Sequence, residues 1–161
     1  MARRNADSND RLEAAQRLGE LGEALVADWL RQQGWRVVAQ RWHCRWGELD
    51  IIAMAFGRSE TIASDPDPNL AFVEVKSRRQ GSLDRIGRLA ITPQKQQKLW
   101  RSAEVFLAQM PQYAELPCRF DVALVEQGPL GRSTGLMQRA IADGGYTLTL
   151  VDYIVNAFDG S

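Results

Sequence analysis

The sequence predicts an α/β fold in which a single mixed central sheet is flanked by helices. Three observations favour this class. A helical pattern opens the chain and three β-rich runs follow it. A second helical pattern then precedes two further β-rich runs. The 161 residues suffice for one core, and no apolar stretch approaches the roughly 18 residues that cross a membrane.

The first helix is expected from Arg11 to Gln33, because apolar residues recur there at three- and four-residue steps. These residues are Leu18, Leu21, Leu25 and Trp29. Gly34 ends the helix as a C-cap. Residues 1–10 are polar and charged, so we expect a disordered tail there and a single domain over residues 11–161.

The remaining elements follow from composition and turn residues. Strands are expected over residues 35–42, 49–55, 70–77, 119–125 and 146–155. Thr92 as N-cap and Pro93 at the first helical position predict a second helix that ends near Met110. We expect a turn near Arg45 to Gly47, a long hairpin loop over 57–69 and a connection over 78–91.

Charge and cysteine content narrow the function classes. The net charge is zero, which counts against a protein that coats nucleic acid through excess Lys and Arg. The polar start of the chain does not resemble a signal peptide, so a cytoplasmic location is expected. In that reducing compartment Cys44 and Cys118 are expected as free thiols.

Two segments carry the chemistry: GELDIIA (residues 47–53) and FVEVKSR (residues 72–78). Side chains alternate along a strand, so Glu74 and Lys76 share one face, as Glu48 and Asp50 do on the preceding strand. If the two strands pair as a hairpin, Asp50 lies beside Glu74. An ion pair of Glu74 and Lys76 on an exposed edge strand is the plainer alternative, but the flanking residues are apolar on both faces.

Paired carboxylates in an apolar sheet predict a metal ion. Two carboxylates about 4 Å apart repel by on the order of 4 kcal/mol at a dielectric near 20. Mg²⁺ or Mn²⁺ removes that repulsion, polarises a phosphoryl group and lowers the pKa of a bound water. Lys76 is then expected to orient that water or to stabilise charge on the phosphate.

The first helix offers a third acid. The helical neighbours of Glu23 are small and apolar, among them Gly19, Val26 and Leu30, whereas Glu20 has polar neighbours. A glutamate on an apolar flank is the anomalous one, so Glu23 is the better candidate ligand. The plainer alternative is a solvated helix glutamate.

Six pieces of the chain, in order, resemble the YraN family of small bacterial proteins. They are LGELGEALVADWL, RWGELDIIA, AFVEVKSR, ITPQKQQKL, RFDVALV and VNAF. That family is assigned to the PD-(D/E)XK restriction-endonuclease-like superfamily, whose pattern implies catalytic Glu23, Asp50, Glu74 and Lys76, with the three acids as metal ligands. The chain departs from the pattern in a long loop between Asp50 and Glu74 and in an aromatic, basic stretch from Trp42 to Trp46.

The resemblance implies a divalent-metal-dependent nuclease that hydrolyses phosphodiester bonds in DNA. Structured or branched DNA is the preferred substrate class by analogy of fold, and symmetric cutting would favour a homodimer. The alternative is a non-catalytic nucleic-acid-binding module with the same fold.

Basic residues near the acidic motif predict where nucleic acid would bind. We expect Arg78 and Lys95 to contact it, Lys95 because it begins a helix whose dipole attracts phosphate. Three further arginines, with Trp42 and Trp46 interleaved, suit phosphate contact and base stacking: Arg36, Arg41 and Arg45. Each of these has a solvated surface residue as its plainer alternative.

The remaining sequence features argue against a zinc hydrolase and a nucleotide-hydrolysing enzyme. His43 is the only histidine, which argues against a zinc hydrolase, and it is expected on an edge strand or loop. Asp121 is expected to be structural and to pair with an arginine. The chain contains no nucleotide-binding GxxxxGK[ST] segment.

Overall fold

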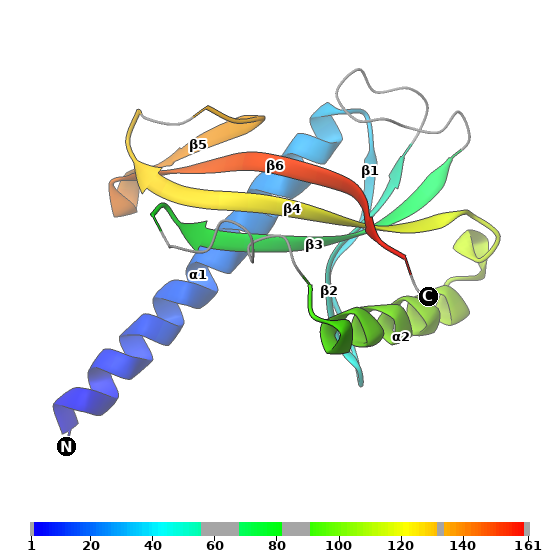
Figure 1. Ribbon diagram of the computed structural model, residues 1–161, viewed down its shortest axis with the longest axis horizontal. Coiled ribbons are helices and arrows are strands. Elements are labelled where there is room, and N and C mark those ends of the chain that lie inside the picture. Colours follow the sequence, from blue (N-terminus) through cyan, green and yellow to red (C-terminus); the bar gives the residue numbers. More distant parts are fainter. Residues whose placement is uncertain (1, 56–67, 82–90, 132–133, 160–161) are drawn as a thin grey trace.

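The computed structural model describes residues 2–55, 68–81, 91–131 and 134–159, with side chains from residue 6 onward (Figure 1). The described helices are α1 (Ala2–Gln32) and α2 (Pro93–Gln109), with short 3-10 turns at Pro111–Tyr113 and Ala142–Gly144. The strands are β1 (Arg36–Cys44), β2 (Gly47–Ala55), β3 (Asn69–Arg79), β4 (Cys118–Pro129), β5 (Met137–Ile141) and β6 (Tyr146–Phe158).

The six strands form one mixed sheet in the order β1-β2-β3-β4-β6-β5. β3 and β4 are parallel, and the other neighbouring pairs are antiparallel. α2 lies between β3 and β4 in the chain, as a parallel crossover requires. The predicted mixed α/β fold with one central sheet is therefore confirmed.

Each face of the sheet is covered by one helix. α1 packs Leu25, Trp29 and Leu30 against Ile51 and Val73 on one face. α2 packs Leu99, Ala103 and Phe106 against the other face, which contributes Ile52, Leu70, Phe72, Phe120 and Val122. Phe106 contacts Phe72 edge-on, with ring centroids 6.1 Å apart. No helix among the described residues is long and apolar enough to cross a membrane.

β2 and β3 separate partway along their length, and this fork positions the site. Their ladder runs from the pair Ala55↔Asn69 to the pair Ile51↔Val73 and stops there. β2 stays paired with β1 up to Gly47, and β3 stays paired with β4 up to Arg79. β2 also twists here, because Leu49 joins the apolar cluster on the α2 side while Ile51 joins the one on the α1 side.

Helix ends and turns follow the local sequence. The Thr92 hydroxyl accepts a hydrogen bond from the Lys95 backbone N–H (3.2 Å), as expected of an N-cap ahead of Pro93. Gly34 follows α1 with φ +84°, the left-handed conformation that ends many helices. The predicted turn between β1 and β2 is also present at Arg45 and Trp46.

The structure differs from the sequence predictions in two places. α1 begins at Ala2, so residues 2–10 continue the helix instead of forming a disordered tail; the segment contains no Gly or Pro to stop it. β5 was not predicted, because a five-residue edge strand carries too short a pattern. Most of the loop expected over 57–69 and of the connection over 78–91 lies outside the described residues.

Gly22 sets the distance between α1 and β3. A Cβ at this position would overlap the Ser77 hydroxyl of β3, whereas one at Gly19, about a turn earlier, would meet nothing within 4 Å. We expect Gly22→Ala to destabilise the protein by about 1–3 kcal/mol through this overlap. Gly19→Ala should instead stabilise α1 by roughly 0.5–1 kcal/mol.

Urea unfolding of both variants tests the close approach. Adding Ser77→Ala to Gly22→Ala removes the overlapping hydroxyl and should restore most of the lost stability. Equal stabilisation by Gly22→Ala and Gly19→Ala would show that α1 does not approach β3 this closely.

Candidate active site

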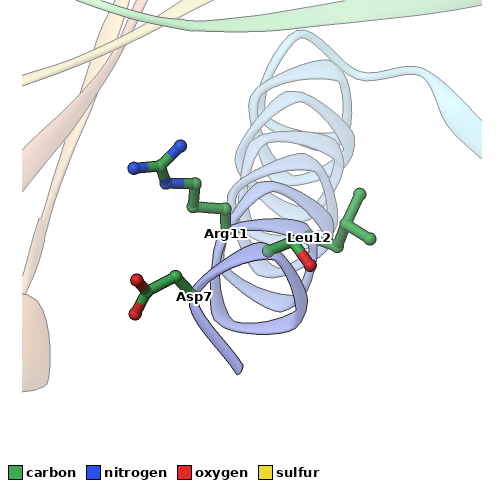
Figure 2. Close-up of a pocket in the computed structure, with 4 residues that line it drawn as sticks. Asp7, Arg11 and Leu12 are labelled. Carbon is green, nitrogen blue, oxygen red and sulfur yellow. The ribbon is translucent and has the colours of Figure 1, made fainter. Parts of the chain in front are cut away.

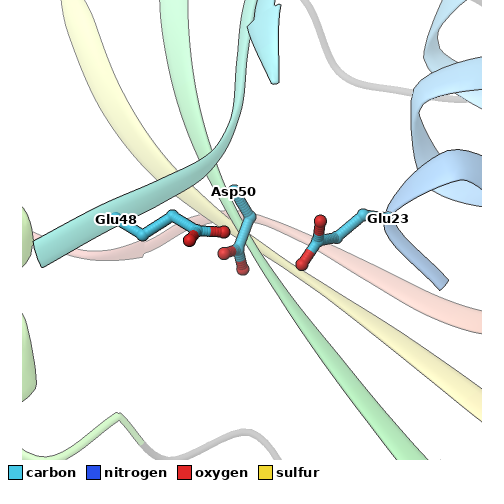
Figure 3. A group of neighbouring side chains, drawn as sticks. All are labelled: Glu23, Glu48 and Asp50. Atoms are coloured by element: carbon cyan, nitrogen blue, oxygen red, sulfur yellow. The ribbon is translucent and has the colours of Figure 1, made fainter. Parts of the chain in front are cut away.

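Three carboxylates converge at the fork from two different elements. Glu23 of α1 and Glu48 and Asp50 of β2 each offer an oxygen, and the three oxygens lie within 4.8 Å of one another. Figure 3 shows the Glu23 side chain reaching from the helix toward the two side chains of the strand. The Glu23 side chain is 15% exposed, against 44% for Glu20. Of the two helix glutamates, the one on the apolar flank is therefore the one in the cluster.

Asp50 occupies the point where the β2–β3 ladder ends. Its Oδ2 accepts the backbone N–H of Val75 at 2.8 Å, so the carboxylate takes a donor of β3 at the point where β2 turns away. This bond fixes the carboxylate between the two diverging strands. Because the ladder stops here, the Asp50 carboxylate takes the place of a backbone carbonyl as the acceptor for the Val75 N–H.

Burial and mutual repulsion disfavour the charged forms of these acids. Burial, then the Glu74 carboxylate, raise the pKa of Asp50 to about 8, against the opposing effect of the Val75 N–H. Burial and the Glu48 carboxylate raise the pKa of Glu23 to about 7. When they are charged, the carboxylates of this cluster therefore repel one another.

Glu74 reaches the same region from the α2 side of the sheet. Its Oε1 lies 3.4 Å from the Lys95 Nζ, and its Oε2 is buried with no hydrogen-bond partner among the described residues. Lys76 follows two residues along β3, and burial and the neighbouring Arg78 lower the pKa of its ammonium group. The predicted pairing of strands β2 and β3 therefore brings Glu74 close enough to Asp50 to interact with it electrostatically.

The tightest acidic set differs from the expected one by a single residue. The sequence indicated Glu23, Asp50 and Glu74 as ligands, whereas the three closest carboxylates include Glu48 in place of Glu74. Glu48 shares a strand face with Asp50, and that spacing was the available signal. Glu74 instead pairs with Lys95, which contacts the acid site although it was expected only to bind nucleic acid.

Arg41 was expected only as one of several basic residues that suit contact with phosphate, but the structure places it against the acids of the site. Its guanidinium lies 2.9 Å from Glu20 Oε1, 3.7 Å from Glu23 Oε2 and 3.5 Å from Glu48 Oε1. Its backbone adopts φ +51°, uncommon for a residue other than glycine. No local pattern announces this role, because it depends on the pairing of β1 with β2. Arg41 thus supplies positive charge between α1 and the cluster.

The other predicted residues have varied surroundings. Arg78 is exposed and donates to the Ser77 carbonyl. His43 lies on the edge strand β1, as expected, with Nε2 2.7 Å from Glu48 Oε2. Trp42 is partly buried and packs edge-on against Phe106 at the border of the core, and its stacking on bases stays a prediction. Cys44 and Cys118 are free, as expected.

A shallow hollow on the projecting part of α1 lies apart from this site. It is lined by Asp7, Ser8, Arg11 and Leu12. Figure 2 shows Asp7, Arg11 and Leu12 spread around the outside of the helix. They do not converge on a common point, so the fork remains the better candidate for chemistry.

The donors at the fork suit a hard divalent cation. All are carboxylate oxygens, the ligand type that Mg²⁺ and Mn²⁺ prefer. Glu23 Oε2 is buried and accepts no hydrogen bond within the described chain, so a coordination valence is left open there. The residues present therefore fit the predicted metal ion. Glu23, Asp50 and Glu48 or Glu74 would hold it.

The raised acid pKa values predict how the metal-free stability depends on pH. Folded Glu23 and Asp50 hold their protons up to about pH 7 and 8, whereas unfolded carboxyls lose them near pH 4. Between these values the folded state binds more protons, so its stability falls as the pH rises. We expect urea unfolding without metal to give a free energy lower at pH 8.5 than at pH 5.5, by on the order of 1–3 kcal/mol.

Divalent metal should reverse this trend by neutralising the cluster, and the rise in Tm on adding Mn²⁺ should be larger at pH 8.5 than at pH 5.5. A metal-free stability that rises between pH 5.5 and 8.5 by a similar amount would contradict the buried repulsion.

The single six-stranded mixed sheet, with one helix on each face, defines a restriction-endonuclease-like α/β fold. Residues 22–125 match the family described as "Uncharacterised protein family UPF0102". The chain belongs to this family, which is the YraN family that its motifs resemble.

Two relatives illustrate the match. The chain is 46% identical over 155 residues to a UPF0102 protein of Acaryochloris marina, covering 88% of this chain and 89% of the relative. It is 50% identical over 108 residues to a UPF0102 protein of Thermosynechococcus vestitus, covering 67% and 79%. The similarity therefore extends over nearly the whole length of some relatives.

Proposed function

We propose that this protein is a divalent-metal-dependent nuclease that hydrolyses phosphodiester bonds in DNA. The observation that carries the proposal is the convergence of Glu23, Glu48 and Asp50 at the fork of the sheet. Glu74 of β3 interacts electrostatically with Asp50 and also with Lys76, two residues further along β3. Acids brought together at such cost of repulsion indicate a bound cation. A cation of this type beside a lysine is suited to attack on a phosphate diester.

The position of each acid indicates its proposed role as a metal ligand. Asp50 is the central ligand, because Val75 holds its carboxylate at the point where the strands part. Glu23 and either Glu48 or Glu74 complete the acidic set. A bound Mg²⁺ or Mn²⁺ would supply an activated water and neutralise charge on the phosphate.

Lys76 and Lys95 bring positive charge to the same site. The lowered pKa of Lys76 eases proton exchange with an attacking water, and its charged form would stabilise the developing phosphate charge. Lys95, at the first turn of α2, pairs with Glu74 and would be free to contact a phosphate if Glu74 served as a metal ligand. Arg78 is exposed at the end of β3 and is proposed as a further phosphate contact.

DNA is the proposed substrate, and structured or branched DNA the preferred form. That preference comes from the fold class alone, in which small nucleases of this kind resolve junctions. A DNA substrate implies a cytoplasmic location, and symmetric cutting of two strands would require two copies of the chain.

Cleavage of labelled DNA tests the proposal. Wild-type protein with Mn²⁺ should cut at least one of duplex, single-strand, flap and four-way-junction DNA. Lys76→Ala should lower the rate by about 100-fold or more, because the group that acts on water or phosphate is gone.

Binding without cutting by the wild type would favour the alternative, a non-catalytic nucleic-acid-binding module. Equal cutting by wild type and Lys76→Ala would remove Lys76 from the mechanism and point to a contaminating nuclease. If the wild type neither binds nor cuts any of these DNAs, the assignment to DNA is overturned.

A further inference from the structure

The tip of the β1–β2 hairpin carries an arginine–tryptophan–arginine cluster. The Arg45 guanidinium carbon lies 4.8 Å from the centre of the Trp46 ring, and that of Arg101, from α2, lies 4.4 Å from it. Both distances are within the range of a cation–π contact. The indole therefore holds two guanidinium groups from different elements at one place.

The hairpin tip is anchored to α2 beneath this cluster. The Cys44 thiol lies 3.4 Å from the Ser102 hydroxyl and also accepts the Trp46 backbone N–H at 3.4 Å. Because Ser102 is buried, this contact is part of the packed interior and not a transient contact at the surface. Arg45 and Arg101 are thus fixed at their bases while their side chains remain exposed.

The charge of this cluster has no acidic counterpart among the residues that the structure describes. Within the described part of the chain, no carboxylate makes an ion pair with Arg45 or Arg101. By contrast, Arg41, Arg119 and Arg139 all have acidic partners. Stacking on an indole leaves the N–H edges of a guanidinium free, and these edges match phosphate oxygens. Two held but unneutralised guanidiniums indicate an external anion.

The cluster adjoins the acid site on two elements. Trp46 precedes Glu48 by two residues on the hairpin, and Arg101 is linked along α2 to Lys95, which contacts Glu74. Lys98 is exposed between them at the three-residue spacing that makes helix residues neighbours. A line of positive charge therefore leads from the fork to the hairpin tip.

We propose that Arg45 and Arg101, held on Trp46, bind the phosphate backbone of DNA next to the bond that is cut. The proposal rests on the nuclease function and adds the direction of the substrate, which passes from the fork along α2 to the hairpin tip. It also assigns Trp46 a positioning role, because the ring keeps both guanidiniums in place without itself contributing charge.

The test is DNA binding by the full chain, measured by fluorescence anisotropy with Ca²⁺ in place of Mg²⁺ over a range of salt concentrations. The double variant Arg45→Gln/Arg101→Gln should bind about 10-fold or more weakly near 0.1 M salt. Its plot of log affinity against log salt should be shallower by roughly 1.4–1.8, as two lost phosphate contacts require. Arg11→Gln/Arg31→Gln removes the same charge from exposed positions on α1 and should bind as the wild type does.

Trp46→Ala separates positioning from net charge. It keeps both arginines but frees them, so its affinity should fall by several-fold although the charge is unchanged. The rise in Tm on adding Mn²⁺ should stay the same in the arginine variants, which shows that the fold and the acid site are intact.

Two outcomes would overturn the inference and differ from each other. Equal binding by the wild type and Arg45→Gln/Arg101→Gln would remove the cluster from the DNA path while the nuclease proposal stands. Absence of DNA binding by the wild type itself would overturn both.

Discussion

Replacing Asp50 by asparagine is expected to abolish the stabilisation that Mn²⁺ or Mg²⁺ gives the wild-type protein, and to lower DNA cleavage by about 100-fold or more. A ligand that binds only the folded state at 100 times its Kd stabilises it by about 2.7 kcal/mol. Asp50 is the acid on which this effect depends, because it lies between Glu23, Glu48 and Glu74.

The metal-free fold should survive the Asp50→Asn change. The asparagine oxygen can still accept the Val75 N–H, which holds the end of the β2–β3 ladder. Loss of one buried charge also relieves repulsion with Glu74, so the metal-free variant should be at least as stable as the wild type at pH 8.

Thermal unfolding without Mn²⁺ and with Mn²⁺ at about 100 times its Kd measures the effect. Glu104→Gln is the matched control, since it removes one exposed negative charge from α2 and should keep the full metal response. A metal response that persists in Asp50→Asn would move the metal site away from the fork.

Replacing Asp121 by alanine should cost about 3–5 kcal/mol of stability, the second large effect. Asp121 is fully buried in β4 and accepts the Arg119 Nε–H at 3.1 Å and the Tyr153 hydroxyl at 2.7 Å. It also accepts the Asn156 N–H at 2.8 Å, where the backbone adopts φ +51°. Without the carboxylate, the largely buried Arg119 guanidinium over Trp35 loses its counter-ion.

Urea unfolding at pH 7 measures the loss, and Tyr153→Phe gives a graded comparison. That variant deletes one donor to Asp121 and should cost about 1 kcal/mol, so the two variants should differ by several-fold. The folded fraction of Asp121→Ala should still respond to Mn²⁺, because Asp121 is structural. A cost below about 1 kcal/mol for Asp121→Ala would show that the network does not stabilise the sheet.

The fold could be predicted because its signals are local. The apolar stripe of α1, the cap at Thr92 and the alternation around Glu74 each depend on a few neighbouring residues. β5 was missed because five residues on an edge carry little pattern. The start of α1 was missed because exposed polar residues follow no apolar period, although they remain helical.

The site residues could be predicted where a charged side chain stands in an apolar segment of the sequence. A glutamate and a lysine inside an apolar strand drew attention to Glu74 and Lys76, and an apolar helix flank separated Glu23 from Glu20. The roles of Arg41 and Glu48 in the acid site were not predicted, because they depend on which strands pair and where β2 leaves β3. Trp42 and Trp46 have similar sequence surroundings, yet Trp42 packs partly buried against Phe106 and Trp46 lies between two arginines.

The proposed function depends above all on a divalent cation at the fork. Anomalous diffraction at the manganese absorption edge, from crystals grown with Mn²⁺, tests it most directly. We expect a peak about 2.0–2.3 Å from an Asp50 carboxylate oxygen, with Glu23 and Glu48 or Glu74 completing the protein ligands. No peak at the fork in a well-ordered crystal, or a peak only at other acidic residues, would contradict it.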